Sequence, residues 1–335
     1  MNRSLGTLAR AGLGIAVSVV ALYLVLRSVD LARAWEVLRS AAPGWIAVML
    51  LLVLLDVSAR GLRWQWLLRP IAHVPYRRVL GYTFMGYLAN NVLPARLGEL
   101  VRSHALGQGE GLSRTTVLGT VVVERVIDTA IVVGIAAVSI LVLSVRGVLA
   151  SAVLLGFAFV GLLVVALAVG VAAHRLPGMR RITAFAERWP RVVELARRLR
   201  EGLSVAGRPS TVAGAAAIGL VAWSASIGTF LVGGQALGIE LSLSQAALLS
   251  SGVSLATIVP SGPGYLGTFE LTAASIAGLF GVGSDAGFAL AVLVHAAIVV
   301  VTSVGGLVAF LRLRGRTGDA PSGTRNEGPS TDGPS

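Results

Sequence analysis

Two long apolar stretches of this chain are each interrupted by a Pro- and Gly-rich break that leads into an acidic residue. The first break lies within residues 90–99 and the second within residues 258–270. Backbone inside a lipid bilayer must satisfy its own hydrogen bonds, so an interruption is tolerated only where it is buried in protein or lines a wet cavity. We therefore take the two breaks as the first candidates for a functional site.

The apolar stretches themselves set the fold class. Apolar residues make up 55% of the chain and charged residues 13%, and apolar runs of roughly 18 residues or more recur, which is typical of a polytopic helical membrane protein. We predict an all-α fold with about six full spans, at 11–28, 43–59, 117–143, 147–173, 211–237 and 286–311. The interrupted segments 79–112 and 243–284 are too broken for one clean helix and are predicted to be re-entrant hairpins or pairs of short helices.

The charged residues exclude several classes of protein. The formal charge of +12 comes entirely from Arg, and many of these Arg lie between apolar runs, which fits a membrane surface better than nucleic acid, for which no binding motif is present. The absence of Cys excludes a disulfide framework and a thiol nucleophile. The four His show no metal-ligand spacing. We expect no metal, no cofactor and no nucleic-acid partner.

The distribution of Arg predicts an orientation. Segment 174–210 contains nine Arg and three Glu, so we expect it to be a cytoplasmic loop, with both termini cytoplasmic and the chain in the cell inner (plasma) membrane. Residues 1–316 would form the membrane domain and 317–335 a disordered tail. Residues 61–79, with Trp64, Trp66 and Tyr76 among Arg, are expected to lie at the membrane interface.

The same orientation count predicts an internal repeat. Segments 43–59, 79–112 and 117–143 would run opposite to segments 211–237, 243–284 and 286–311. Such an inverted-topology repeat is the arrangement in which many secondary transporters build a midplane site from two broken segments. A chance likeness between two Pro/Gly-rich breaks is the alternative.

Three ionisable residues lie deep in one predicted span. Glu124, Arg125 and Asp128 fall within the hydrocarbon thickness of about 30 Å, where an ionised group costs about 2.5–3.5 kcal/mol unless it is paired or hydrated. A structural interpretation is an internal salt bridge that locks this helix to its neighbours. A functional interpretation is that Arg125 or a carboxylate faces a cavity and handles a phosphate headgroup or a proton.

The first break carries polar residues that suit an anionic ligand. These residues are Asn90, Asn91, Arg96, Glu99 and Arg102. Arg96 and Arg102 follow Pro94 on what would be the first turns of a half-helix, where the helix N-terminus and planar, bidentate Arg side chains favour phosphate. Arg that anchors the hairpin against lipid headgroups is the alternative. The two adjacent Asn need buried partners.

The second break is predicted to be a hinge. Together with Pro94 and Gly98 of the first break, the hinge positions are Pro260, Gly262, Pro263, Gly264 and Gly267. It is not a nucleotide-binding P-loop, because the Lys-Ser/Thr ending is missing. Glu270 either titrates in a proton relay or accepts hydrogen bonds at the half-helix start. His295 is either a packed, hydrogen-bonded side chain or a proton carrier, and Asp56 is expected to pair with Arg60 at a helix end.

Three motifs in this order resemble the lysylphosphatidylglycerol synthase transmembrane-region family, also called flippase-like domain proteins. They are Asn-Asn-x-x-Pro-x-Arg-x-Gly-Glu-x-x-Arg from Asn90 to Arg102, Glu-Arg-x-x-Asp from Glu124 to Asp128, and the Pro-Gly-Tyr-Leu-Gly centred on Tyr265. The likeness covers about residues 5–315, and Gly264-Tyr265 stands where the family pattern usually has Gly-Gly. The resemblance implies a membrane module similar to lipid-translocating domains, without the soluble aminoacyltransferase domain of the bifunctional members.

The residues and the resemblance together predict a lipid translocase or carrier for a phosphate-bearing or amino-acid-modified phospholipid or an isoprenoid-linked lipid. Its partners would be membrane lipids with anionic headgroups. An intramembrane transferase and a scaffold subunit of a cell-envelope enzyme are the alternatives, and self-association stays open. The residues expected to bind the substrate are Asn90, Asn91, Arg96, Glu99, Arg102, Glu124, Arg125, Asp128 and Glu270.

Overall fold

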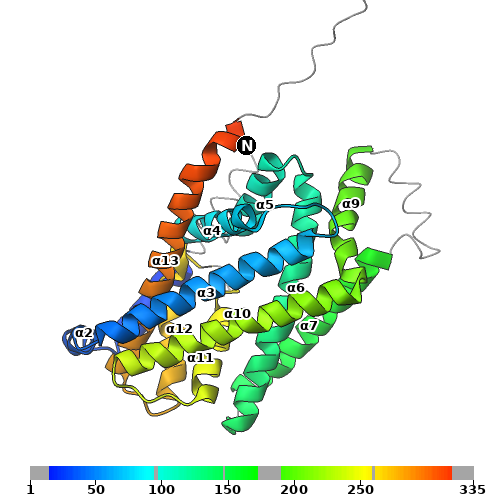
Figure 1. The fold of residues 1–335 in the computed structure, drawn as a ribbon. Coiled ribbons are helices and arrows are strands. Elements are labelled where there is room, and N and C mark those ends of the chain that lie inside the picture. The colour runs from blue at the N-terminus through cyan, green and yellow to red at the C-terminus, as the bar shows by residue number, and fades with distance from the viewer. Residues whose placement is uncertain (1–14, 94–96, 146–147, 173–189, 259–260, 319–335) are drawn as a thin grey trace, which may run out of the picture.

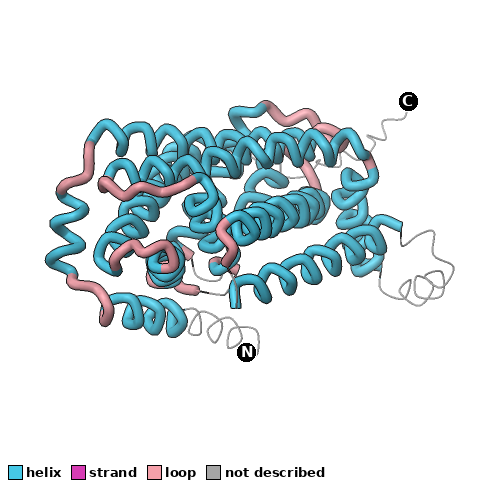
Figure 2. Tube along the Cα trace, turned by 90° about the horizontal axis from the view of Figure 1, so that it is seen from below, coloured by secondary structure: helices cyan, strands magenta, loops and turns pink. Residues whose placement is uncertain are grey.

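The computed structural model describes residues 15–93, 97–145, 148–172, 190–258 and 261–318. These residues form helices joined by short loops, and none of them forms a strand (Figure 2). Five helices are long and apolar enough to cross a membrane, or six if a bent pair near the N-terminus counts as one span. The prediction of an all-α polytopic membrane protein is therefore confirmed.

The five candidate spans lie in long helices. They are α3 (Pro43–Leu68), α6 (Arg114–Val142), α7 (Val148–Ala172), α10 (Pro209–Ala236) and α13 (Ser284–Gly318). The shorter elements are α2 (Leu31–Arg39), α4 (Tyr76–Val92), α5 (Gly98–Gly109), α9 (Pro190–Leu203), η3 (Ser204–Gly207), α11 (Leu243–Ala256), η4 (Pro263–Tyr265) and α12 (Thr268–Gly278). The predicted tail 317–335 lies outside the described residues except for its first two positions, which end α13.

The first predicted span, 11–28, is followed by a sharp bend. The described part of 11–28 is the helix Ile15–Leu26, which meets α2 at an angle of 87°. Asp30 causes the second helix to start there, because its Oδ1 accepts hydrogen bonds from the backbone N–H groups of Ala32 and Arg33. This cap begins a new helix in a different direction, just beyond the predicted span 11–28.

Helices α3 and α10 form an antiparallel pair that runs across one face of the bundle (Figure 1). At one end the backbone N–H of Ala42 donates to the carbonyl of Ala236 over 2.9 Å. At the other end Trp66 Nε1 donates to the carbonyl of Thr211 over 3.2 Å. The start of each helix therefore lies beside the end of the other.

Helix α3 and helix α10 each lead into a helical hairpin, and the two hairpins start from opposite ends of the α3–α10 pair. Helices α4 and α5 follow α3, whereas α11 and α12 follow α10 at the other end of the bundle (Figure 1). The tips of the two hairpins meet, because α4 contacts η4. Both predicted breaks are thus real interruptions, and they lie next to each other in the molecule.

The contacts between helices repeat in the two halves. Helix α4 packs on α13 of the other half, and α11 packs on α6 in the same way. Because the two halves have the same order of elements and their leading helices are antiparallel, the predicted inverted repeat is confirmed as an architecture. The largest hydrophobic cluster, which includes Met49, Leu249 and Val294, joins α3 and α10 to the second hairpin and α13.

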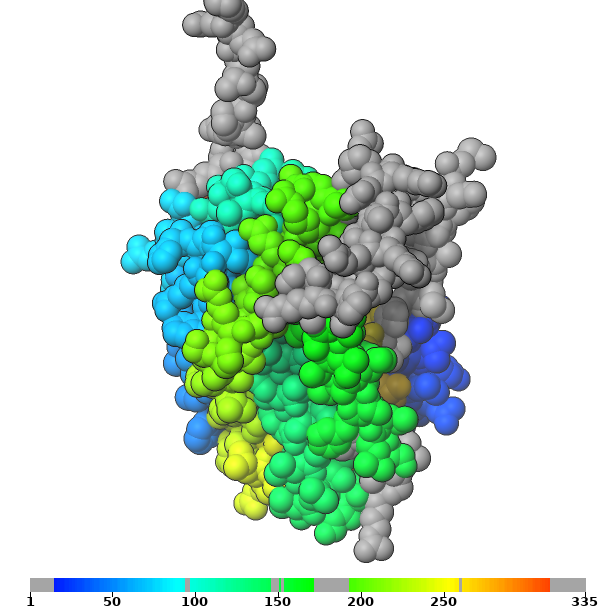
Figure 3. Space-filling model, turned by 90° about the vertical axis from the view of Figure 1, so that its right-hand side faces the viewer, coloured from blue at the N-terminus to red at the C-terminus, as the bar shows by residue number. Residues whose placement is uncertain are grey.

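Helices α7 and α9 lie outside this repeat, as do α2 and the helix Ile15–Leu26 that precedes it. Helix α7 is on the outer face, where Leu154 and Leu155 are each 71% exposed, as expected of side chains that contact lipid (Figure 3). Helix α9 occupies part of the predicted basic loop 174–210 and packs on the start of α6, where Gly119 and Gly202 approach closely. Residues 173–189 of that loop lie outside the described chain.

The predicted interfacial segment 61–79 needs a correction. Helix α3 continues to Leu68, and Arg63 and Trp64 are both completely buried. The sequence suggested an interface because Arg and Trp cluster there. The side chains are buried instead because carboxylates of α6 neutralise Arg63, and Trp64 Nε1 donates to Thr120 over 3.2 Å.

Candidate functional site: a polar cavity between two hairpin tips

The first hairpin tip is held by its two amides. Asn90 Oδ1 accepts a hydrogen bond of 2.7 Å from the backbone N–H of Gly98, and so joins the two sides of the break. Asn91 Nδ2 donates to the hydroxyls of Thr302 and Ser303 on α13, both at 2.9 Å. These bonds supply the buried partners that adjacent amides require. The two Asn therefore position the tip through their side-chain bonds.

Gly98 is at the tip because no side chain fits there. A Cβ on Gly98 would collide with the carbonyl oxygen of Gly86, on the α4 side of the hairpin. Helix α5 can start this close to α4 only with glycine at that position. Pro94 and Arg96, which were predicted as a hinge and a ligand-binding residue, lie outside the described residues.

The second hairpin tip depends on two glycines with positive φ. Gly264 has φ 63° and Gly267 has φ 82°, a conformation in which L-residues with a side chain are strained. A Cβ on Gly267 would also lie 2.5 Å from the carbonyl oxygen of Ser18 in the N-terminal helix. Ser18 Oγ accepts a hydrogen bond of 2.8 Å from the N–H of Gly262. The N-terminal helix thus fixes this tip, and Pro260 lies outside the described residues.

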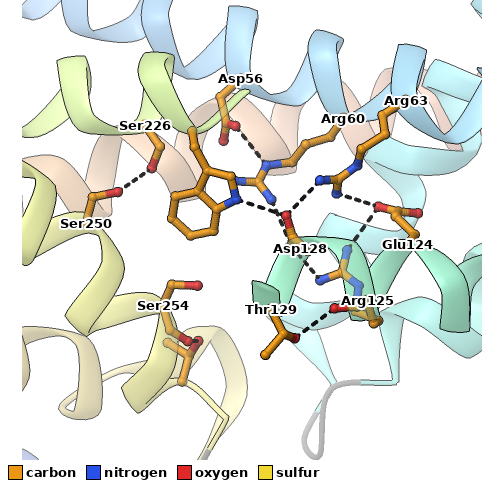
Figure 4. A network of polar contacts seen from close by, with 12 residues as sticks. Asp56, Arg60, Arg63, Glu124, Arg125, Asp128, Thr129, Ser226, Ser250 and Ser254 are labelled. Atoms are coloured by element: carbon orange, nitrogen blue, oxygen red, sulfur yellow. Dashed lines mark hydrogen bonds and ion pairs between the residues drawn. The ribbon is translucent and has the colours of Figure 1, made fainter. Parts of the chain in front are cut away.

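A network of arginines and carboxylates lies beside the tips, at the middle of α6 (Figure 4). Arg63 is fully buried and bridges two acids, with Nη1 at 2.7 Å from Asp128 Oδ1 and Nη2 at 2.9 Å from Glu124 Oε1. Arg102 Nη2 donates to Glu124 Oε2 over 2.9 Å. Trp223 Nε1 donates to Asp128 Oδ1 over 3.0 Å. Each deep carboxylate is therefore held by several donors.

The network extends in both directions from these acids. Arg60 pairs with Asp56 over 2.8 Å and with Asp128 over 3.4 Å, so the expected Asp56–Arg60 pair forms but is buried among other charges. The guanidinium of Arg60 lies over the Trp223 ring, 5.2 Å from its centroid. The guanidinium of Arg102 lies over Trp64 in the same way at 4.6 Å. The two aromatic faces shield the cations from lipid.

Arg125 differs from the other arginines because it is partly free. Its Nη2 contacts Glu124 at 3.1 Å and its Nη1 contacts Asp128 at 3.4 Å, yet 42% of its side chain is exposed. Its Nε has no hydrogen-bond partner among the described residues. An unpaired donor of a buried cation is costly and favours a ligand that accepts from it.

A second, smaller polar pair lies across from the arginines. His295 Nδ1 and Glu270 Oε1 are 2.5 Å apart, and both side chains are buried. Glu270 Oε2 also accepts a hydrogen bond of 2.6 Å from the N–H of Gly267, at the start of α12. The His295 ring stacks on Phe269 with centroids 4.3 Å apart. Of the two roles considered for Glu270, the bond at the helix start is therefore present.

These groups enclose one cavity of about 200 Å³. Its wall includes Asn90, Asn91, Gly98, Glu99, Arg102, Arg125 and Asp128 from the first half of the chain. The second half contributes small hydroxyls and His295, and a pair of these hydroxyls, Ser226 and Ser250, are 2.9 Å apart. Glu124 and Glu270 lie directly behind the wall, where each bonds to a lining residue. The structure thus gathers every predicted binding residue that it describes.

A neighbouring hollow of about 250 Å³ leads from the cavity to the side of the bundle. It shares Glu99, Arg125, Asp128 and Ser254 with the cavity and reaches Ile258, which is 49% exposed. The charged wall is therefore open to a face on which apolar side chains are exposed.

Sequence reasoning missed Arg63, Trp223 and Ser254 as residues of this site, and it considered Arg60 only as the partner of Asp56. Arg63 was placed at the membrane interface because local hydropathy falls after residue 59. Arg60 and Arg63 are three residues apart and lie on the same face of the helix as Val57 and Trp64. This spacing was the signal that α3 continues. The serine and Trp223 carry no such signal, since they are ordinary residues of apolar helices.

Two curated proteins are similar to this chain. A glycosyltransferase, AglD of Haloferax volcanii, is 27% identical over 90% of this chain and 54% of its own length. A UPF0104 membrane protein, MJ1595 of Methanocaldococcus jannaschii, is 25% identical over 34% of this chain and 35% of its own length. The chain thus spans about half or less of the relatives that it matches.

Residues 12–306 match the family described as the lysylphosphatidylglycerol synthase TM region. The match includes both hairpins, the arginine network and all the described lining of the cavity. This chain is a multi-pass membrane protein that belongs to the lysylphosphatidylglycerol synthase TM region family.

Proposed function

We propose that this protein is a lipid translocase or carrier that binds a phosphate-bearing lipid headgroup in the cavity between its two hairpin tips. The observation that carries the proposal is Arg125, whose half-exposed guanidinium lines the cavity and keeps one buried N–H donor without a partner. A phosphate oxygen is the acceptor that Arg recognises best. The lipid tails would stay outside, along the side opening that reaches Ile258.

The charges of the network support an anionic ligand. Four arginines, Arg60, Arg63, Arg102 and Arg125, are connected to three carboxylates, Asp56, Glu124 and Asp128. These seven groups of the network therefore carry one net positive charge. Glu99 also lines the cavity and has no ion pair among the described residues. In this position the ionised Glu99 carboxylate repels an anion and so lowers the affinity of the cavity for an anionic headgroup.

The repeat supports movement of the headgroup as well as binding. The two hairpins start from opposite ends of the bundle and their tips meet at the cavity. Rocking of one half against the other would open the cavity first toward one end and then toward the other, as in carriers built from inverted repeats. We also propose that the protein lies in the cell inner membrane with both termini in the cytoplasm, because the Arg-rich segment between α7 and α10 favours that side.

A liposome assay tests this function. The purified protein is reconstituted in vesicles that contain fluorescent phosphatidylglycerol, and a membrane-impermeant quencher reports how much lipid changes leaflet. We expect Arg125→Gln to lose most of the transfer, about tenfold or more, and Glu99→Gln to keep or increase it. Arg197→Gln, on the exposed face of α9, is the matched control. Equal transfer by the wild type and Arg125→Gln would refute the assignment of Arg125.

Substrate class is tested in the same vesicles. Fluorescent glucosylceramide has a polar headgroup without phosphate, and it should move far more slowly than phosphatidylglycerol. A thermal unfolding curve for each variant shows whether the fold survives the substitution. Transfer of both lipids at the same rate would mean that phosphate is not recognised.

A second candidate is an intramembrane transferase acting on a lipid-linked substrate, and the name of the AglD relative favours it. Glu124 and Asp128 are each held by several arginines, so Glu99 is the carboxylate of the cavity wall best placed to act as a base. This function predicts that purified protein forms product from a lipid-linked acceptor and an activated sugar. Product formation by the wild type that is lost in Glu99→Gln, together with no lipid transfer by the wild type in vesicles, would support it over the carrier.

A further inference from the structure

Two carboxylates at the cavity, Asp128 and Glu124, are held by several arginines each. Asp128 contacts Arg60, Arg63 and Arg125, and Trp223 also donates to it. Adding a proton to it would leave buried arginines without their counter-charge, which is strongly unfavourable. The same holds for Glu124, which has three arginine partners. These two acids therefore stay ionised.

The pair formed by Glu270 and His295 has no cationic partner. The nearest contacts of the pair are the 2.5 Å bond between them, the 2.6 Å bond from Gly267 N–H and the stacked ring of Phe269. Among the described residues, none makes a hydrogen bond to Nε2 of His295. With a neutral imidazole the pair carries one buried negative charge, which a proton on the ring would balance.

The other charged groups around the pair are few. Helices α10 and α11 contribute no charged side chain to the cavity, and α2 meets α13 near Asp285, ten residues before His295. Across the cavity, α3 presents Asp56 and Arg60, which are bonded to each other.

Helices α4, α5 and α6 and the short helix η4 supply the other charged or titratable side chains that line the cavity. Helix α5 presents Glu99 and Arg102, and α6 presents Arg125 and Asp128. The phenols of Tyr87 and Tyr265, from α4 and η4, also line the cavity. Arg125 is the most exposed of these arginines, so an anion that binds Arg125 meets the negative Glu270–His295 pair across a small space.

We infer that His295 and Glu270 form a proton-binding site, and that uptake of one proton by His295 accompanies binding of the anionic headgroup. This inference rests on the proposed function, since it needs an anion in the cavity. The proton comes from water and resides on the imidazole, and no bond to the lipid forms or breaks. Because linkage is reciprocal, the factor by which a bound anion strengthens proton binding to the pair equals the factor by which the bound proton strengthens anion binding.

The pair is also placed to transmit this change to the second hairpin. Glu270 Oε2 holds the N–H of Gly267, the positive-φ residue at which α12 begins. A proton on His295 draws the Glu270 carboxylate toward the ring and so weakens its hold on Gly267. The tip that packs on Ser18 would then be freer to move when both proton and headgroup are bound.

A binding experiment with a phosphodiester tests the inference, because a phosphodiester keeps one charge across the pH range used. The detergent-solubilised full chain is titrated with dihexanoyl phosphatidylglycerol and, separately, with dimethyl phosphate, at about pH 6 and about pH 8. We expect the wild type to bind the lipid about tenfold more tightly at the lower pH. Proton uptake, followed with an indicator dye in weak buffer, should approach one per lipid bound.

The decisive variant is His295→Gln. It should bind the lipid with the same affinity at both pH values and take up no proton. His73→Gln is the matched control, because His73 is exposed in the loop between α3 and α4, and it should behave as the wild type. Thermal unfolding shows that His295→Gln is folded, and His295→Asn serves in its place if it is not.

The outcomes separate the two proposals. Absence of lipid binding at either pH would overturn the proposed function and this inference with it. Binding by the wild type without pH dependence or proton uptake, or the same pH dependence in His295→Gln, would overturn the inference alone. Dimethyl phosphate binding as tightly as the lipid would identify a free phosphate ester, and not a lipid headgroup, as the ligand that is coupled to the proton.

Discussion

Removal of Arg63 tests whether the buried network holds the two halves of the molecule together. Arg63 is completely buried and makes ion pairs of 2.7 Å and 2.9 Å with Asp128 and Glu124. In Arg63→Met the apolar stem is kept and the charge is lost, so both acids lose a partner inside the bundle. Breaking a buried ion pair by removing one partner costs about 3–5 kcal/mol. Since Arg102 and Arg125 still contact Glu124, we place the expected loss toward the lower end of that range.

The measurement is thermal unfolding of the purified protein in detergent, followed by circular dichroism. For a chain of this size class the loss corresponds to a fall in the unfolding midpoint on the order of 10 °C. Arg197→Met on α9 is the control, because Arg197 is 71% exposed and pairs with Glu194 at the surface, where an ion pair contributes at most about 1 kcal/mol. If Arg63→Met lowers the midpoint no more than Arg197→Met, the network is not a stabilising connection and the reasoning fails.

The hairpin tips and the membrane orientation give three further predictions. Gly267→Ala should destabilise the protein by about 1 kcal/mol or more beyond Gly281→Ala in thermal unfolding, because both residues have positive φ but only Gly267 lacks room for a Cβ; equal losses would exclude the collision with the N-terminal helix. Asn91→Leu should cost about 1–3 kcal/mol, since the hydroxyls of α13 lose their partner, and an unchanged midpoint would contradict the role of this amide. Because the chain has no Cys, Arg200→Cys and Glu240→Cys each introduce a single thiol on the surface, and an impermeant maleimide added to whole cells should label the second and not the first.

Much of the architecture could be predicted from local sequence. Hydropathy located the long helices, and Pro and Gly located both hairpin tips, because a bilayer span needs an uninterrupted apolar helix and these residues interrupt one. An internal salt bridge was one of the two interpretations of the motif from Glu124 to Asp128, since its spacing of three and four places the side chains on one face of a helix. The ion pair between Arg125 and Asp128, three residues apart, is present in the structure.

Prediction failed where the partner of a residue lies far away along the chain. Arg63 was placed at the membrane interface because an isolated Arg is costly in lipid, and nothing near it in the sequence shows that Glu124 and Asp128, more than 60 residues later, neutralise it. Glu270 and His295 were considered separately, since the bond between them exists only after α12 folds back on α13.

The sequence by itself determined that this chain is a bundle of membrane helices with two broken hairpins, because helix length and interruption are local properties of hydropathy, Pro and Gly. Only the tertiary structure decided that Asn90 and Asn91 hold the first tip, that Arg125 is the arginine of the network whose side chain is partly exposed to the cavity, and that His295 faces the arginines across one cavity. These outcomes depend on which helices pack together. In a low-dielectric interior, a charge or an amide whose partner is supplied by packing has a structural role. A group whose partner is not supplied by packing is available for a ligand.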